Sequence, residues 1–203
     1  MWESVWVGLS FSLGLFYANA GEWVIHRYLL HGSGKHKDSF WNFHWGEHHR
    51  NCRKHAHVDP DYQRSIFGLH AQGKEAFGIL LLLLLHVPLL WVLPYFALAV
   101  FFSGANYMRV HKRSHQDTQW GRKYLPWHYD HHMGKDQDQN WCVSWPVFDW
   151  IMGTRVPYAG TAAESQDLAR AARRLQPRVE VTEVPHPSTP PPPSGTGGDQ
   201  PML

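Results

Sequence analysis

A chain of 203 residues is long enough for one domain of ordinary size and too short for two substantial domains with a linker. A formal charge of +2 and the lack of a long basic run argue against nucleic-acid binding. The only two cysteines, Cys52 and Cys142, lie far apart in the sequence, so they do not form a disulfide framework and fit a reducing, cytoplasm-facing setting.

The first apolar segment runs from Val5 to Ile25 and contains no lysine or arginine. Its length matches the roughly 20 residues of a membrane-spanning helix, so we predict a span over about residues 5–25. A cleaved signal peptide is the alternative. Against it, the segment lacks a basic start and runs straight into His26 without a small-residue cleavage site.

A second apolar block extends from Glu75 to Met108, again without lysine or arginine, and contains Pro88 and Pro94. One straight helix of this length would measure about 50 Å, against a hydrocarbon core of about 30 Å. Because proline interrupts a helix, we predict a hairpin with spans over about residues 75–90 and 92–108.

Basic residues flank these apolar segments in a one-sided pattern. All eight lysines and arginines before the second block lie from Arg27 to Lys74, and six more follow from Arg109 to Lys135. By the positive-inside rule both segments are cytoplasmic. We therefore predict an all-α integral membrane helical bundle with a helical cap on its cytoplasmic side.

The composition changes beyond Tyr158. The stretch from Ala162 to Leu175 is rich in alanine, arginine and glutamate, which predicts a short helix. The proline and glycine that follow are too dense for the chain to bury much apolar surface. We therefore predict a membrane-embedded domain over residues 1–158, then a short helix and a disordered Pro/Gly-rich tail over residues 159–203.

Histidine is the unusual residue, because most of the 16 histidines fall into two short windows. They form four motifs: His26 with His31, His44 with His48 and His49, His111 with His115, and His128 with His131 and His132. On an α-helix, residues three or four apart share a face, so histidines with these spacings are predicted to converge.

Histidines five residues apart are predicted to behave differently, because on an α-helix they point about 140° from each other. His26 and His31 are therefore expected to serve different metals, or to lie where a helix ends at Gly32. His49 is expected to be turned away from His44 in the same way.

Ten imidazoles are too many for one ion of four to six ligands and suit two ions with an open position each. The pattern therefore predicts a dinuclear site in the cap. Imidazole suits iron, zinc, copper and nickel, so the ligands alone do not choose the metal. His36, His55 and His57 lie near the second motif without its spacing, and their role stays open.

The four motifs, in this order and with an apolar hairpin between the second and third, resemble those of the fatty acid hydroxylase and sterol desaturase superfamily. The resemblance runs from about His26 to Thr154. It implies a metal-ligand role for His26, His31, His44, His48, His49, His111, His115, His128, His131 and His132.

The resemblance also implies the chemistry: an oxygen-dependent hydroxylase or desaturase of a fatty acyl, sterol or carotenoid substrate. Two metal ions are implied, with iron first and zinc as the alternative in purified protein, and O2 is the co-substrate. Because no segment has room for a cytochrome b5-like domain, an external donor of the cytochrome b5 or ferredoxin type is expected.

Four carboxylates are candidates to orient the ligand histidines from behind: Asp149, Glu22, Glu47 and Asp130. Glu22 lies one helical turn before His26, and Asp149 belongs to a closing segment that resembles the family's. Solvated carboxylates at the membrane interface are the alternative interpretation. The sequence predicts no catalytic group beyond the metal ligands.

Two other classes of protein compete with the enzyme. A metal transporter would place polar ligands near the membrane midplane, whereas only His86 lies inside an apolar block. A zinc-binding membrane protein without catalysis is the second rival, because histidine clusters can serve structure alone. Metal content and oxygen consumption distinguish these classes.

Overall fold

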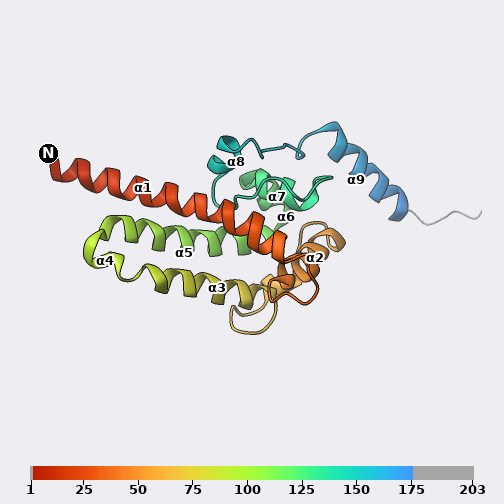
Figure 1. Ribbon diagram of the computed structural model, residues 1–203. Helices are drawn as coiled ribbons and strands as arrows, with labels where there is room; N and C mark the ends of the chain where they lie inside the picture. The colour runs from red at the N-terminus through yellow and green to blue at the C-terminus, as the bar shows by residue number, and fades with distance from the viewer. Residues whose placement is uncertain (1, 176–203) are drawn as a thin grey trace, which may run out of the picture.

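The computed structural model describes residues 2–175, and every regular element in this range is helical. Its long helices are α1 (Trp2–Val24), α3 (Ala71–His86) and α5 (Pro94–Gln116), which run alongside one another (Figure 1). The short α4 (Leu89–Val92) closes the hairpin between α3 and α5. The all-α prediction is confirmed for these residues, and the predicted disordered tail falls mostly outside the described residues.

The short elements gather where α1 and α5 end, at the opposite end of the long helices from α4 (Figure 1). We call this region the cap. It contains two π-helices, η1 (Ile25–Ser33) and η2 (Phe43–His49), α2 (Arg50–Lys54), the 3₁₀ turn η3 (Pro60–Gln63), α6 (Thr118–Tyr124), α7 (Pro126–Met133) and α8 (Val147–Ile151). The last described helix, α9 (Ala162–Leu175), follows the cap and coincides with the predicted helix.

The hairpin turns where the prolines predict a turn. α3 ends at His86, Pro88 directly precedes α4, and Pro94 is the first residue of α5. Proline suits this first position because its missing N–H has no partner there in any helix. The second apolar block therefore returns to the cap, and the last two turns of α5 lie there.

α1 and α5 approach closely at Gly14. A Cβ added there would lie 2.5 Å from the carbonyl oxygen of Phe96 and 2.7 Å from the Cβ of Ala99, so only glycine fits without a shift. The small buried residue Ala99 belongs to the facing surface of α5. This contact fixes the end of α1 that leads into η1 relative to the end of α5 that carries the third histidine motif.

The predicted membrane spans overlap α1, α3 and α5 with ends shifted by a few residues, but their proposed role is not supported. Within residues 2–175, no helix combines the length and the apolar character required to cross a bilayer. α3 has 16 residues, fewer than the roughly 20 of a spanning helix. The second half of α5 carries the polar run from Arg109 to Gln116.

α9 is tied to the cap by a buried carboxylate. Glu164 is 2% exposed and accepts hydrogen bonds from Nε and Nη2 of Arg122 in α6, at 2.6 and 2.7 Å, and from the backbone N–H of Gly160. The Arg122 guanidinium lowers the pKa of Glu164 to about 2. The carboxylate is therefore charged at neutral pH and joins α9 to α6.

Replacing Glu164 with glutamine is expected to lower the free energy of unfolding by about 1 kcal/mol, a small value because Arg122 is half exposed. The pKa of Glu164 is below its ordinary value of 4.5 in the folded chain, so its stabilisation is complete above pH 4.5 and disappears as the pH falls toward 2. Thermal melting of the wild type and of Glu164→Gln should converge over this window. A difference in Tm that does not change with pH would contradict the role of this pair.

Candidate metal centre

The ten predicted ligand histidines meet in the cap as two adjacent clusters, and every one of them is buried. The first cluster consists of His26, His31, His44, His49 and His131, whose ligand nitrogens all lie within 4.8 Å of one another. The second consists of His48, His111, His115 and His132 under the same limit. His128 joins the second cluster, because its Nε2 lies 2.8 Å from Nε2 of His115.

The two π-helices explain how the five-residue spacings work. In a π-helix the hydrogen bonds run from i to i+5, so residues five apart lie over one another on the same face. His26 and His31 in η1 therefore converge, and so do His44 and His49 in η2, whose Nε2 atoms are 3.1 Å apart. The prediction that these pairs diverge was wrong, because it assumed α-helical geometry.

His44 and His48, which were predicted to converge, belong to different clusters. His48 lies in the second cluster, so the neighbours His48 and His49 point to different clusters. α7 divides its histidines likewise, with His131 in the first cluster and His132 in the second, so the predicted convergence of His128 with His131 was also wrong. In the α-helices, the spacing of four, as in His111 with His115 and His128 with His132, brings both partners to one cluster.

Backbone and side-chain oxygens hold three rings of the first cluster in one tautomer. Nδ1 of His26 lies 2.5 Å from the carbonyl oxygen of Trp141, and Nδ1 of His131 lies 2.6 Å from that of Gln139. Nδ1 of His31 faces the carboxylate of Asp138 at 3.0 Å. Since these oxygens only accept, each Nδ1 carries the proton and each neutral ring presents the lone pair of Nε2 to the cluster.

The Nε2 atoms of the first cluster face one another at short range. Nε2 of His49 lies 3.0 Å from Nε2 of His31 and 3.1 Å from that of His131, while His26 and His44 approach to 2.9 Å. The amide nitrogen of Gln137 lies 2.9 Å from Nδ1 of His49, so His49 can carry its proton on Nε2, but that proton can meet only one of the neighbouring lone pairs at a time. A cation among the nitrogens would turn this repulsion into coordination, which is the arrangement that metal-binding histidines show.

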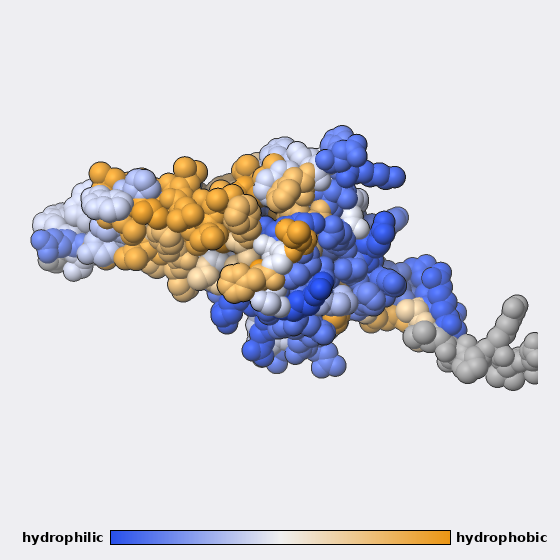
Figure 2. Space-filling view, turned by 90° about the horizontal axis from the view of Figure 1, so that it is seen from below, coloured by the Kyte–Doolittle hydropathy of each residue, from blue (hydrophilic) through white to orange (hydrophobic). Residues whose placement is uncertain are grey.

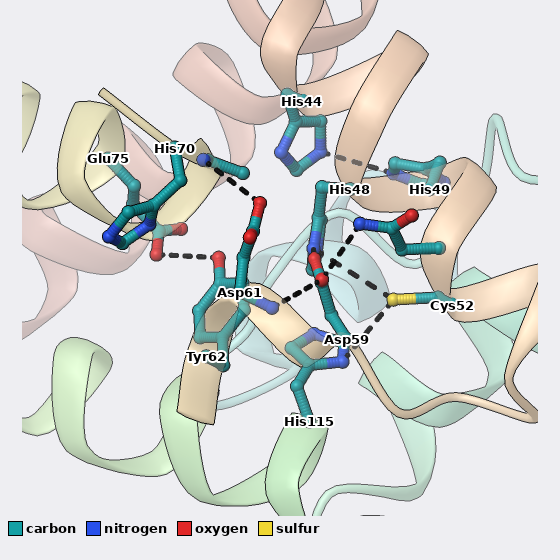
Figure 3. Close-up of polar contacts among 12 residues, drawn as sticks. His44, His48, His49, Cys52, Asp59, Asp61, Tyr62, His70, Glu75 and His115 are labelled. Atoms are coloured by element: carbon teal, nitrogen blue, oxygen red, sulfur yellow. Dashed lines mark hydrogen bonds and ion pairs between the residues drawn. The ribbon is translucent and has the colours of Figure 1, made fainter. Parts of the chain in front are cut away.

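Carboxylates hold two rings of the second cluster from behind, and Figure 3 shows one of these carboxylates, Asp59, beside His48. Asp59 accepts from Nδ1 of His48 at 2.7 Å, and Glu75 lies 2.8 Å from Nδ1 of His111. Glu75 also accepts from the hydroxyl groups of Tyr62 and Tyr107. For these two carboxylates the sequence contains one weak signal of a role at the site: Glu75 is the lone acid at the start of an apolar helix.

The four carboxylates proposed from the sequence lie elsewhere. Asp149 accepts from the backbone N–H groups of Trp141 and Cys142, so it acts on His26 only through the Trp141 carbonyl. Glu22 accepts from the backbone N–H groups of Val143 and Ser144 in the same loop. Asp130 forms an ion pair with Arg155, and Glu47 forms one with Lys74 at the surface. Within residues 2–175, none of the four has a hydrogen bond or ion pair with a clustered imidazole.

Burial keeps most of these imidazoles neutral. It lowers the pKa of His26 to about 3 and holds the pKa values of His44, His49, His115, His128, His131 and His132 well below the usual range, with neighbouring imidazoles adding to the effect. His48 is the exception. Although burial opposes its charged form, the Asp59 carboxylate, 2.7 Å from its Nδ1, raises the pKa of His48.

The donor set fits two divalent ions of the iron or zinc type. Neutral imidazole nitrogens on preoriented rings are the ligands that both metals accept, and outer carboxylates and carbonyls raise the basicity of such ligands. A cation in the second cluster would take the place of the proton on His48. Metal ligation by the ten histidines stays a prediction that this geometry supports.

An apolar pocket of about 560 Å³ adjoins the site between α1, α3 and α5. His26 and Glu75 line the part nearest the clusters, and leucines of α3 line much of the remainder. Tyr17 and His86, whose side chains hydrogen-bond at 3.0 Å, line it near the hairpin. A pocket of this volume and lining suits an elongated apolar molecule.

Replacing Glu75 with glutamine is expected to weaken binding of the second ion by about 10- to 100-fold, because His111 loses its charged partner. Competition with a chelator for the purified protein measures this affinity. Glu47→Gln is the matched control, since Glu47 pairs with Lys74 outside the site. Equal loss of affinity in both variants would show that Glu75 does not act through His111.

The comparisons with known proteins agree with this geometry. No match was found among curated proteins, and none was found among solved structures. The family model described as fatty acid hydroxylase matches residues 11–154, a range that contains the second half of α1, the hairpin and both histidine clusters. Because the match covers most of the chain, this protein belongs to the fatty acid hydroxylase family.

Proposed function

We propose that this chain is an oxygen-dependent di-iron hydroxylase of a lipid-like substrate, a fatty acyl, sterol or carotenoid molecule. Membership of the family supports an oxidoreductase. The observation that carries the proposal is the shared pocket: His26 of the first cluster and Glu75, which holds His111 of the second, line the same apolar cavity. An apolar chain in this cavity would lie beside both clusters.

The ten histidines would hold the two ions, which when bound supply the oxidising power that an unactivated C–H bond requires. The remaining work belongs to the protein. Leucines of α3 and the apolar face of α1 would exclude water and align the substrate chain. Asp59, Glu75 and the Trp141 carbonyl would keep the imidazoles in the ligating tautomer.

Hydroxylation is proposed ahead of desaturation, the alternative within the superfamily. Both begin with removal of one hydrogen from the substrate chain. They differ in whether a hydroxyl group is added or a second hydrogen is removed. The pocket contributes to this choice by how firmly it holds the chain near the clusters.

We further propose that the apolar end of the molecule sits in a membrane and that the cap faces the cytoplasm. Figure 2 shows hydrophobic residues over the long helices and hydrophilic residues over the cap. Exposed side chains on these helices and on α4 include Leu13, Phe16, Leu84, Leu85 and Trp91. The basic residues of the cap support the cytoplasmic orientation by the positive-inside rule. Retention in the membrane fraction after an alkaline wash would support the attachment.

An external electron donor, of the cytochrome b5 or ferredoxin type, completes the proposal. Hydroxylation by O2 consumes two electrons in addition to those of the C–H bond. The reductant is proposed to be a separate protein.

The test is expression in a lipid-producing host under labelled oxygen, with His131→Ala as the inactive reference. The expected result is a lipid that gains one labelled oxygen atom only with the wild type. A lipid that loses two hydrogens would assign desaturation instead. Stoichiometric zinc without oxygen consumption would overturn the enzyme proposal in favour of a metal-binding protein.

A further inference from the structure

A further histidine, His57, lies against the second cluster. Its side chain is completely buried, and its ring centroid is 4.6 Å from that of His115, 5.5 Å from that of His132 and 5.8 Å from that of His128. In sequence it lacks the spacing of the motifs, which is why its role stayed open. The segment between α2 and η3 brings it to the site.

The backbone at His57 is held in an unusual conformation. Ala56 has φ 52° and His57 has φ 80°, a region that residues with a Cβ rarely adopt. The backbone N–H of His57 donates to the carbonyl of Cys52 at 2.7 Å, and its own carbonyl lies 2.9 Å from Nδ1 of His115. One residue thus holds His115 through its carbonyl and presents a second ring to the same cluster.

Both ring nitrogens of His57 are buried without a hydrogen-bond partner among the described residues. Burial of an imidazole with no partner is unfavourable, because water is lost from both nitrogens. Gly121 leaves room for the ring, because a Cβ added at this position would lie 3.1 Å from Nε2 of His57. A strained backbone and a glycine therefore position a ring that has no hydrogen-bond partner in residues 2–175.

We propose that His57 is a further ligand of the ion held by the second cluster. The inference rests on the proposed two-metal site and adds a residue to it. Like His128, His57 lies outside the four nitrogens that are within 4.8 Å of one another, so its ring moves toward the ion on binding. Cluster members and His57 together then offer the second ion six imidazoles, against five for the first.

The asymmetry has a chemical consequence. Six imidazoles fill the coordination shell of a six-coordinate ion, whereas five leave one position free. The open position then belongs to the ion of the first cluster, which contains the pocket-lining His26.

His57→Asn removes the imidazole ring and keeps the backbone as it is, because asparagine tolerates positive φ. The backbone carbonyl that accepts from His115 is therefore retained. The expected result is at least a tenfold weaker binding of the second cobalt(II) or iron(II) ion, with binding of the first ion unchanged. The cobalt(II) ligand-field spectrum of the second equivalent should change as well. His55→Asn is the matched control, since His55 is exposed two residues away.

Wild-type affinity for both ions in His57→Asn would overturn the assignment. If that variant does not fold, His57→Gly with added imidazole replaces it, and binding of the second ion should return with imidazole; failure to return would also overturn the assignment. A wild-type protein that binds no metal would instead remove the two-metal proposal itself. These outcomes keep the two inferences apart.

Discussion

Replacing His131 with alanine is expected to abolish product formation and to empty the first metal site. His131 is completely buried, its Nε2 lies 3.1 Å from that of His49, and its Nδ1 is anchored to the Gln139 carbonyl. The loss in metal affinity should exceed the 10- to 100-fold that loss of an outer partner typically costs. Metal analysis of the purified protein and product analysis in the lipid-producing host measure the two effects.

His55→Ala is the control for this experiment, because it removes the same chemical group from an exposed position in the cap. It should leave metal content and activity at the wild-type level. The fold of His131→Ala should persist, since the long helices and their contact at Gly14 do not involve this ring. Full metal content in His131→Ala would remove His131 from the ligand set.

The helical bundle was predictable because its signals are local. The apolar runs gave the long helices, and Pro88 and Pro94 gave the turn between α3 and α5. Membrane crossing did not follow from the same signals, because apolar character averaged over a helix is diluted by residues such as Asn19 and Glu22 in α1. A sequence pattern that predicts a helix therefore does not by itself predict whether that helix crosses a membrane.

The ten histidines were predictable as a set, but their division between two clusters was not. Spacing converts to direction only when the helix type is known, and η1 and η2 are π-helices. Nothing in the sequence around His44 distinguishes an i to i+5 from an i to i+4 pattern. His48 and His49 consequently lie in clusters with other histidines than the prediction gave them.

The groups that orient the imidazole rings could not be predicted from the sequence either. Glu75 meets His111 across 36 positions and Asp138 meets His31 across 107, so no local motif joins them. The Trp141 and Gln139 carbonyls belong to the backbone and have no residue signature at all. Glu22, Asp130 and Asp149 were near the motifs in sequence, yet they hold loops rather than imidazoles.

Filling the pocket at Gly21 should block substrate without disturbing the metal centre. Gly21 lies in α1 and lines the cavity, and a Cβ added there would meet no atom within 4 Å. Gly21→Phe therefore places a ring in the space proposed for the substrate chain, with no backbone clash. Because glycine is unfavourable inside a helix, the substitution should not destabilise α1. We expect at least a tenfold rise in KM for long-chain substrates, with metal content unchanged.

Gly8→Phe is the matched control. Gly8 also lies in α1 with no atom within 4 Å of an added Cβ, but it does not line the pocket. The two variants add the same side chain to the same helix, so any difference between them reports on the cavity alone. Steady-state kinetics with substrates of increasing chain length make the comparison sharper, since a blocked cavity discriminates most against the longest chains. Equal kinetics for Gly21→Phe and Gly8→Phe would mean that the substrate reaches the clusters by another route, and the link between this pocket and the metal centre would then be lost.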